Sequence, residues 1–558
     1  MKNTASTPVG RTRRACAALL LAACAISSGA PARAQARPRL VVLVSVDQLA
    51  DWVYALGEPH YSDYGGFRRL RSKGVTFTSC AYEHACSETG PGHATIGTGA
   101  PASLHGIVKN QWWSPSEQRA VYCVGVPNEA LADLPEGKDR GPARLLVPTF
   151  ADSVKAHIPG SKVASVSWKD RSAILMAGGA ADVAAWFEKA TGNLVTNTRW
   201  VSETPAWITD FNRARAIDQW FGADWTRSGP ASAYDGLVDD RPYENAHANG
   251  LGQRTLPQPL TGGLEAPGPA YYGQLYASPF GNTIVRHAAT AAVRGMGLGD
   301  DDVPDLLCVS FSSTDVLGHN FGQDSVEARD ALLRLDQELG ALFEMFDEEV
   351  GEGRWAVFLT ADHGVGPTPE QARAAGVAAG RGPLNTWVKS AVQAELTRAF
   401  GSVEGGYVER VSENSVYLKP AAIAAHGEAA VALAARAAGK ARGVMVAYAT
   451  DEVRDDFDHP DPIRRALAFG IVDGRAGHVQ FVNRPYWLNG TTPASHGSPH
   501  AYDREVVGFA MGGGVARGLR FAGPITPGFG VVLFAELLRV PPPTAARETV
   551  PRGLLEAR

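Results

Sequence analysis

Four apolar runs, each followed closely by ionisable residues, constrain the fold of this chain more than any other feature. The runs occupy residues 40–46, 163–168, 305–311 and 355–360. Continuous apolar runs rich in β-branched residues are typical of strands that are buried on both faces, as in parallel sheets. Helical patterns separate these runs. We therefore expect an α/β fold with a doubly wound, mostly parallel sheet and helices on both faces.

Side chains that can bind a metal ion follow the ends of these strands. They are Asp47, Asp315, His319, Asp362 and His363, with His496 in a later loop. Taken singly, each has an ordinary explanation, such as a helix N-cap for Asp47 or a plain loop histidine for His496. In an open α/β sheet, however, ligands bind where the carboxyl ends of the strands share one edge. We therefore expect these side chains to converge.

The chemistry of this set favours zinc. Carboxylates and imidazoles without a cysteine suit Zn²⁺, whereas Ca²⁺ and Mg²⁺ prefer more oxygen ligands. The set is also larger than the group of protein ligands that one catalytic zinc takes. The sequence therefore predicts two metal ions.

Thr89 precedes Gly90-Pro91-Gly92, which is where a helix can begin. Proline is tolerated in a first helical turn, and glycine lets the backbone approach a ligand closely. A hydroxyl at this position would face free N–H groups and the positive end of the helix dipole, which favours a phosphate or sulfate. By itself, such a turn is more often purely structural.

Three further residues are candidates for holding an anion. Lys169 and Arg171 lie two residues apart after the second strand, so both can point at one anion, although a solvated surface pair is the ordinary alternative. Asn110 carries a neutral amide donor, although loop asparagines usually serve turns.

A long amphipathic helix is expected after the third strand. Asp324 and Glu327 have the spacing of a capping box, and leucine and phenylalanine recur at helical spacing over 332–346. That stripe indicates core packing.

Residues 1–36 have the layout of a secretory signal. Basic residues precede an apolar run over 15–26 that is too short to span a bilayer, and small residues follow. We expect a periplasmic or secreted protein, with lipidation of Cys24 as the less favoured alternative. Residues 37–558 are interpreted as one catalytic domain with insertions at about 186–290 and 370–480, around the mouth of the site.

Charge and cysteine content limit the partners. Removing residues 1–36 removes five basic residues and no acidic ones, which takes the formal net charge from −5 to −10. An acidic chain is not expected to bind nucleic acid stably, because phosphate backbones need a basic surface. No transmembrane segment is expected, and a monomer is favoured. Four cysteines remain, with the pairing of any disulfides left open: Cys80, Cys86, Cys123 and Cys308.

Taken together and in this order, these motifs resemble the alkaline phosphatase superfamily. The resemblance is to its PafA-type bacterial branch, which has a threonine nucleophile and is related to the nucleotide pyrophosphatases/phosphodiesterases. The matching segments are Val46-Asp47, Thr89 to Ala94, His105-Gly106-Ile107 with Asn110, Lys169 with Arg171, Asp315 to His319, Ala361 to Gly364, and His496-Gly497-Ser498. They span almost the whole of residues 37–558.

The resemblance implies a site with two Zn²⁺ ions. One would be held by Asp315, His319 and His496, and the other by Asp47, Asp362, His363 and the oxygen of Thr89. Thr89 would be the nucleophile and would form a phospho-threonine intermediate. Asn110, Lys169 and Arg171 would hold the phosphoryl oxygens, and the substrates would be small phosphate esters.

Lys169 and Arg171 favour a phosphomonoesterase. A monoester dianion carries more charge than a diester, and diesterase relatives lack this cationic pair. Phosphodiesterase, nucleotide pyrophosphatase and phosphonate hydrolase activities remain alternatives within the superfamily. A sulfatase is disfavoured because Cys86 is not followed by the Pro and Arg of the sulfatase motif. A non-catalytic, metal-stabilised binding protein is disfavoured by the intact nucleophile and ligands.

Overall fold

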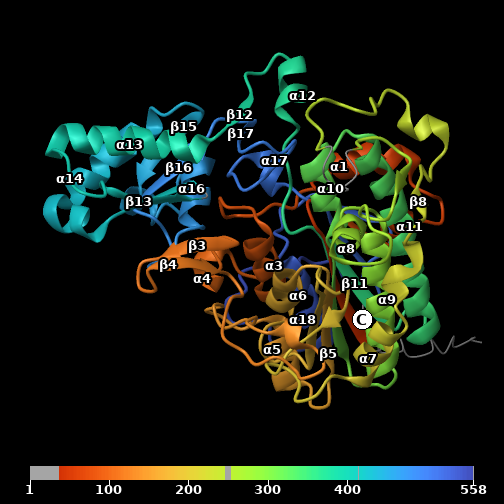
Figure 1. Ribbon diagram of the computed structural model, residues 1–558. Helices are drawn as coiled ribbons and strands as arrows, with labels where there is room; N and C mark the ends of the chain where they lie inside the picture. Colours follow the sequence, from red (N-terminus) through yellow and green to blue (C-terminus); the bar gives the residue numbers. More distant parts are fainter. Residues whose placement is uncertain (1–36, 246–252, 413, 557–558) are drawn as a thin grey trace, which may run out of the picture. The chain divides into compact units, whose positions relative to one another are not determined.

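A nine-stranded sheet forms the centre of the described part of the chain, in the order β19-β2-β18-β11-β1-β10-β5-β6-β7. The structure is a computed structural model that describes residues 37–245, 253–412 and 414–556 (Figure 1). The strands are β1 Leu40–Val46, β2 Gly74–Phe77, β5 Val163–Ser167, β6 Val183–Phe187, β7 Leu194–Val195, β10 Asp305–Phe311, β11 Trp355–Thr360, β18 Gly508–Gly512 and β19 Leu519–Phe521. The secretory signal expected at 1–36, with Cys24, lies outside the described residues.

The middle of the sheet is parallel. β1 pairs in parallel with β10 on one side and β11 on the other, and β5 and β6 continue the parallel run. β7 and β18 pair antiparallel to their neighbours. All residues of β1, β10 and β11 are buried, as expected for strands covered on both faces. The prediction of a mostly parallel α/β sheet is confirmed.

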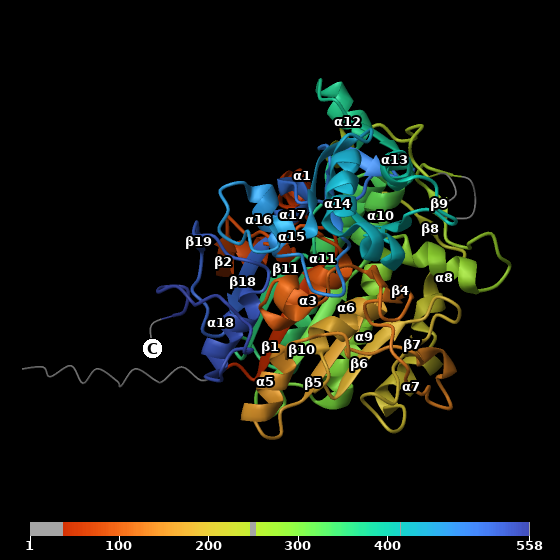
Figure 2. The ribbon, with the colours of Figure 1, turned by 90° about the vertical axis from the view of Figure 1, so that its left-hand side faces the viewer.

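Helices cover both faces of this sheet. In Figure 1, α3, α5, α6 and α18 lie on one side and α9 and α11 on the other, and Figure 2 shows the first group in front of the strands. The helices over these faces and strand ends are α1 Asp51–Gly57, α2 Gly66–Lys73, α3 Thr89–Thr98, α4 Ala102–His105, α5 Phe150–His157, α6 Asp170–Ala177, α7 Ala206–Arg213, α8 Pro269–Tyr276, α9 Phe280–Met296, α10 Ser313–Phe321, α11 Val326–Glu349, α17 Ala501–Arg504 and α18 Phe529–Leu538.

The start of α11 corrects one prediction. The helix is present with its apolar stripe buried, but its N-cap is Ser325, whose side chain accepts a hydrogen bond from the N–H of Ala328 at 3.1 Å. Asp324 instead pairs with Arg241. The capping box expected from Asp324 and Glu327 is therefore wrong, because a serine one residue later caps the helix and a distant arginine takes the aspartate.

A second, antiparallel sheet has its own hydrophobic core. Its order is β13-β14-β16-β15, formed by Val408–Ser412, Ser415–Leu418, Val479–Asn483 and Val444–Ala449. α13 (Leu384–Phe400) and α14 (Pro420–Gly439) pack on it through apolar residues such as Val392 and Ala434. Lys109 Nζ, beside Asn110, donates to Ser415 Oγ at 2.8 Å. The second sheet thus contacts the loop that carries a candidate site residue.

Short elements complete the fold. They are α12 Pro369–Ala374, α15 Thr450–Val453, α16 Pro462–Ala468, and the paired strands β3 Gln111–Ser114 with β4 Arg119–Tyr122, β8 Asp224–Trp225 with β9 Gln258–Pro259, and β12 Gly380–Gly382 with β17 Trp487–Asn489. Within the described residues, no helix is both long and apolar enough to cross a membrane.

The cysteines show no disulfide within the described residues. Cys80, Cys123 and Cys308 are buried free thiols. The thiol of Cys86 donates to Glu88 Oε1 at 3.4 Å.

Candidate active site

The parallel register brings three strand ends together. β1 pairs Val46 with Phe311 and Ser45 with Thr360, so the segments that follow β1, β10 and β11 leave the sheet at one edge. The N–H of Asp47 donates to the carbonyl of Phe311 at 2.9 Å, which fixes the direction of the chain as it leaves β1. Asp47, Asp315 and Asp362 are therefore neighbours although up to 315 positions separate them in the sequence.

The first group that can hold a metal ion consists of Asp47, Asp362 and His363. One potential ligand atom from each lies within 4.8 Å of the others, and all three side chains are fully buried. His363 Nε2 lies 3.3 Å from Asp47 Oδ1 and 3.5 Å from Asp362 Oδ2.

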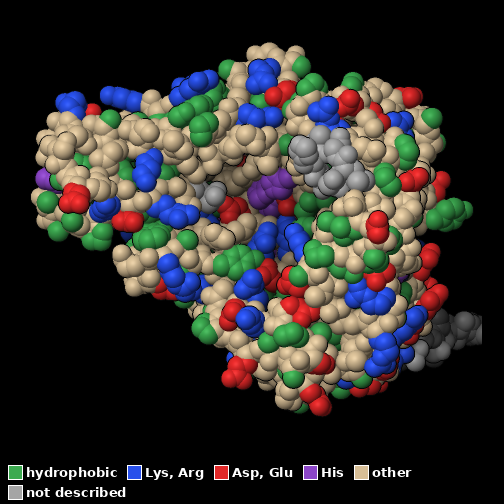
Figure 3. All heavy atoms as spheres, in the orientation of Figure 1, with side chains coloured by type: hydrophobic (Ala, Val, Ile, Leu, Met, Phe, Trp, Pro, Cys, Tyr) green, Lys and Arg blue, Asp and Glu red, His purple; other side chains and the backbone are tan. Residues whose placement is uncertain are grey.

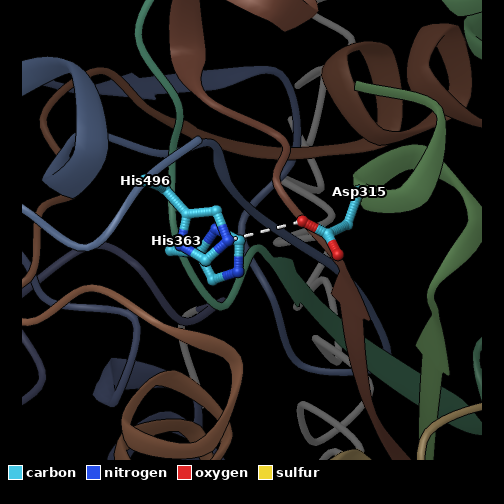
Figure 4. Close-up of side chains that lie close together, drawn as sticks. All are labelled: Asp315, His363 and His496. Carbon is cyan, nitrogen blue, oxygen red and sulfur yellow. Dashed lines mark ion pairs between the residues drawn. The ribbon is translucent and has the colours of Figure 1, made fainter. Parts of the chain in front are cut away.

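The second group consists of Asp315, His363 and His496 (Figure 4). His496 Nε2 is 3.5 Å from Asp315 Oδ1, and the rings of His363 and His496 stack with their centroids 3.6 Å apart. His319, one turn after Asp315 on α10, places its Nε2 3.1 Å from Asp315 Oδ1. His363 therefore lies between the two groups, while His319 lies at the edge of the second.

The donor atoms of these side chains fit metal ions. Nδ1 of each histidine lies against a backbone carbonyl: His319 against Ala494 at 2.9 Å, His363 against Gly364 at 3.0 Å and His496 against Ser87 at 2.8 Å. An Nδ1–H donated to a carbonyl leaves Nε2 with its lone pair, which is how metal-ligating histidines are usually oriented. Asp47 Oδ1, Asp362 Oδ2 and His363 Nε2 are buried without a hydrogen-bond partner among the described residues, as expected of atoms that serve a cation.

The pKa values of these residues reflect crowded buried charge. Burial, and then the negative charge of Asp47, raise the pKa of Asp362. Burial alone would also raise the pKa of Asp47, but the Lys169 ammonium beside it brings the pKa below its usual range. Burial and the neighbouring His363 lower the pKa of His496 to about 4. Neutral His496 is the form that ligates a metal.

Thr89 is the first residue of α3, so its side chain lies at the helix N-terminus. A β-carbon on Gly92 would lie 1.9 Å from the carbonyl oxygen of Asp362, so only glycine lets the first turn of α3 pack against the end of β11. The Gly-Pro-Gly sequence is thus what brings the threonine hydroxyl to the strand ends.

Lys169 and Arg171 converge on that hydroxyl. Lys169 Nζ lies 3.4 Å and Arg171 Nη2 3.2 Å from Thr89 Oγ1. The ammonium also donates to Asp47 and, at 2.7 Å, to Asp315 Oδ2. The two cations predicted to share one anion therefore meet at the predicted nucleophile.

Asn110 is held beside the start of α3. Its Oδ1 accepts from the N–H of Gly90 at 2.7 Å, which leaves the amino group of the side chain as a donor. Its own N–H donates to Glu88 Oε2 at 2.7 Å. Glu88, which the sequence did not single out, therefore positions Asn110.

Two further residues were missed from the sequence. Gln48 has a left-handed backbone (φ 68°), donates its N–H to Asp362 Oδ1 at 3.1 Å and donates its Nε2 to Asp315 Oδ1 at 2.6 Å. Tyr122 accepts from Arg171 Nη1 at 3.3 Å and donates to Asp170 Oδ1 at 2.6 Å. In the sequence, the only indication of a role for either residue is that Gln48 directly follows Asp47, a predicted metal ligand.

Comparison with protein families gives a match over residues 41–498 to the family model described as "Type I phosphodiesterase / nucleotide pyrophosphatase". This chain belongs to that family. The resemblance expected from the sequence motifs is confirmed by this match together with the similarity of the chain to a PafA-type enzyme. This chain is 31% identical over 510 residues to alkaline phosphatase PafA of Elizabethkingia meningoseptica, covering 86% of this chain and 88% of that one.

Two further relatives agree with this placement. Alkaline phosphatase PhoV of Synechococcus elongatus is 35% identical over 342 residues, covering 60% of each chain. The crystal structure of wild-type alkaline phosphatase PafA superposes with a TM-score of 0.82 at 28% identity and covers 92% of this chain and 98% of that one. This chain therefore shares its fold with PafA over nearly the whole of its length.

Proposed function

We propose that this chain is an exported, zinc-dependent phosphomonoesterase, an alkaline phosphatase that hydrolyses small phosphate monoesters through Thr89. The observation that carries the proposal is the position of the Thr89 hydroxyl, which both Lys169 and Arg171 contact beside two carboxylate–imidazole groups. Relatives named as alkaline phosphatases support it.

Seven side chains would hold two zinc ions. Asp47, Asp362, His363 and Thr89 would take one, and Asp315, His319 and His496 the other. When bound, such a pair lowers the pKa of an attacking oxygen and neutralises the charge on a leaving oxygen.

The chain's own residues then account for the transfer. Thr89 Oγ1 attacks phosphorus, the bond from phosphorus to the ester oxygen breaks, and the threonine proton ends on the departing alcohol. Water attacks the resulting phospho-threonine, restores the hydroxyl and releases inorganic phosphate. The position of Thr89 at the start of α3 favours the phosphorylated side chain, because the N–H groups of the first turn stabilise negative charge.

Lys169, Arg171 and Asn110 would hold the non-bridging oxygens. Charge develops on these oxygens during transfer, and fixed donors in a buried site stabilise it without reorganising. A dianionic monoester gains from both cations, whereas a diester carries one charge. This difference supports monoesters over phosphodiester and nucleotide pyrophosphate hydrolysis, the two activities in the family description. Phosphonate hydrolysis remains a further alternative.

The remaining parts of the proposal concern location and assembly. The signal-like residues 1–36 support export to the periplasm or medium, with a lipid anchor at Cys24 as the less favoured form. The acidic charge of residues 37–558 supports a protein without stable nucleic-acid partners, and a monomer is the favoured assembly.

The test compares two substrates on the zinc-loaded protein. We expect p-nitrophenyl phosphate to be hydrolysed with a higher kcat/KM than bis-p-nitrophenyl phosphate, because only the monoester presents a dianion to Lys169 and Arg171. A higher kcat/KM for the diester would overturn the assignment in favour of a phosphodiesterase.

A further inference from the structure

A large cavity opens beside the site on the side of Asp315 and His319. Its volume is about 850 Å³, within the range of pockets that enclose drug-sized molecules. Lys169 and Arg171 also line it, whereas Thr89, Asp47, Asp362 and His363 are not among its lining residues. Figure 3 shows a hollow on this face with histidine and Lys or Arg side chains inside it.

This placement suits the organic group of an ester. If the phosphoryl group is held at Thr89, as proposed above, the ester oxygen departs toward Asp315 and His319, and the group attached to it extends into the cavity. The volume far exceeds the needs of a phosphate alone, so the walls of the cavity are in a position to select among substrates.

One wall is a stack of aromatic rings that ends in a lysine. Trp168 stacks between Phe187 and Tyr276, with ring centroids 5.0 Å and 5.1 Å away. Lys189 Nζ lies 4.2 Å from the centroid of the Tyr276 ring. The three rings are buried, so the ammonium rests on a rigid support.

Lys189 forms no ion pair among the described residues, although the more distant carboxylates of Asp170 and Glu188 attract its charge. The described residues place no carboxylate oxygen within 4.0 Å of its ammonium, whereas Arg140, which also lines the cavity, pairs with Asp170 at 2.5 Å. Among the other acids that line the cavity, Glu136 accepts from Thr191 and Asn193, and Glu188 accepts from the N–H of Ala190.

The surroundings of Lys189 also favour an incoming anion. Loss of water around the ammonium, and then the positive charges of Lys169 and Arg171, lower the pKa of Lys189. The residue is exposed, so a ligand in the cavity can reach it. A negative group bound here would offset the repulsion among the three cations.

We propose that the preferred substrates are phosphate monoesters whose organic group carries a second negative group, and that Lys189 is the specificity-determining residue that binds it. The inference rests on the proposed phosphomonoesterase function and narrows its substrate class.

The test uses two aromatic monoesters that differ only in charge, 4-carboxyphenyl phosphate and its neutral counterpart 4-carbamoylphenyl phosphate. Lys189→Met should lower the ratio of their kcat/KM values, charged over neutral, by about fivefold, the upper end for an exposed ion pair. Lys189→Glu should lower it further, and Lys189→Arg should keep it within about twofold of the wild-type ratio. The matched control is Lys389→Met, which removes an exposed charge from α13 and should leave the ratio unchanged.

An unchanged ratio in both Lys189→Met and Lys189→Glu would overturn the inference while leaving the phosphomonoesterase in place. If the wild-type protein hydrolyses neither probe, the proposed function fails instead. Lys189 is then tested by calorimetry in a Thr89→Ala background, where adding Lys189→Met should weaken binding of the charged probe about fivefold relative to the neutral one. If Lys189→Met weakened the binding of both probes equally, or of neither, the inference would be overturned in that background.

Discussion

Two sets of buried aspartates in this protein differ in what surrounds them. Asp330 and Asp336 on α11 are fully buried, and so are Asp47 and Asp362 at the strand ends. Both oxygens of Asp330 and of Asp336 accept hydrogen bonds from the protein, whereas Asp47 Oδ1 and Asp362 Oδ2 accept no hydrogen bond from the described residues and lie against the ring of His363.

The difference separates structural carboxylates from functional ones. Leaving a buried acceptor unsatisfied costs about 1–3 kcal/mol, and more for a charge, and at the strand ends several such atoms lie together, within reach of one cation. Residue type and burial are the same in both sets, and only the partners differ. We therefore expect substitutions on α11 to change stability and substitutions at the strand ends to change turnover.

The largest effect is expected for Thr89→Ala. Without the hydroxyl, no phospho-threonine can form, and kcat for p-nitrophenyl phosphate should fall at least about 10³-fold. Thr89→Ser should retain more activity than Thr89→Ala, because it keeps the oxygen. Thermal unfolding should be nearly unchanged in both. Near-normal turnover in the alanine variant would place the nucleophile elsewhere, with Ser87 as the next candidate.

Replacing Lys169 and Arg171 together by Ala should change substrate preference. Charged hydrogen bonds contribute about 1.5–3 kcal/mol each, so the dianionic monoester should lose on the order of 10²–10⁴-fold in kcat/KM and the diester much less. The ratio of kcat/KM for p-nitrophenyl phosphate over bis-p-nitrophenyl phosphate should collapse. An equal loss on both substrates would make the two cations structural, like Arg334, which pairs with Asp330 on α11.

Asp330→Ala tests the structural set. Asp330 accepts from Trp225, Ser228, Tyr234 and Arg334, and its removal leaves these donors unsatisfied. The free energy of unfolding should fall by about 2–4 kcal/mol, while kcat/KM per folded molecule stays within about twofold. Asp330→Asn, which keeps one acceptor oxygen, is the matched control and should lose less. If kcat/KM per folded molecule fell together with the free energy of unfolding, the α11 aspartates and the strand-end aspartates would no longer differ in role.

Asp362→Asn should give the smallest change in stability, and it tests the same distinction most sharply. In metal-free protein, this change removes a buried carboxyl whose pKa is raised by burial and by Asp47, and it keeps an acceptor for the Gln48 N–H, so the free energy of unfolding should stay constant or rise by up to about 1 kcal/mol. Turnover of the zinc-loaded variant should nevertheless fall strongly. A loss of stability as large as that of Asp330→Ala would show that Asp362 supports the fold in the same way.

The sequence predicted the strands and the residues at their ends because both signals are local. A buried strand is a short apolar run, and Asp47 or Asp362 directly follows one. Thr89 was found because Gly-Pro-Gly marks a helix start. Gln48, Glu88 and Tyr122 were missed because their roles depend on contacts with segments far away in the chain, and the cap at Asp324 was wrong because Arg241 competes for that carboxylate.

The central claim is that the unsatisfied atoms at the strand ends serve two zinc ions that phosphoryl transfer requires. The most direct measurement is a zinc titration of chelator-stripped protein, with bound metal and p-nitrophenyl phosphate turnover followed together. The account predicts no turnover without metal, and a rise that reaches its plateau at about two zinc ions per chain, the number for a two-metal phosphatase. Full turnover in stripped protein, or zinc uptake that restores none, would contradict it.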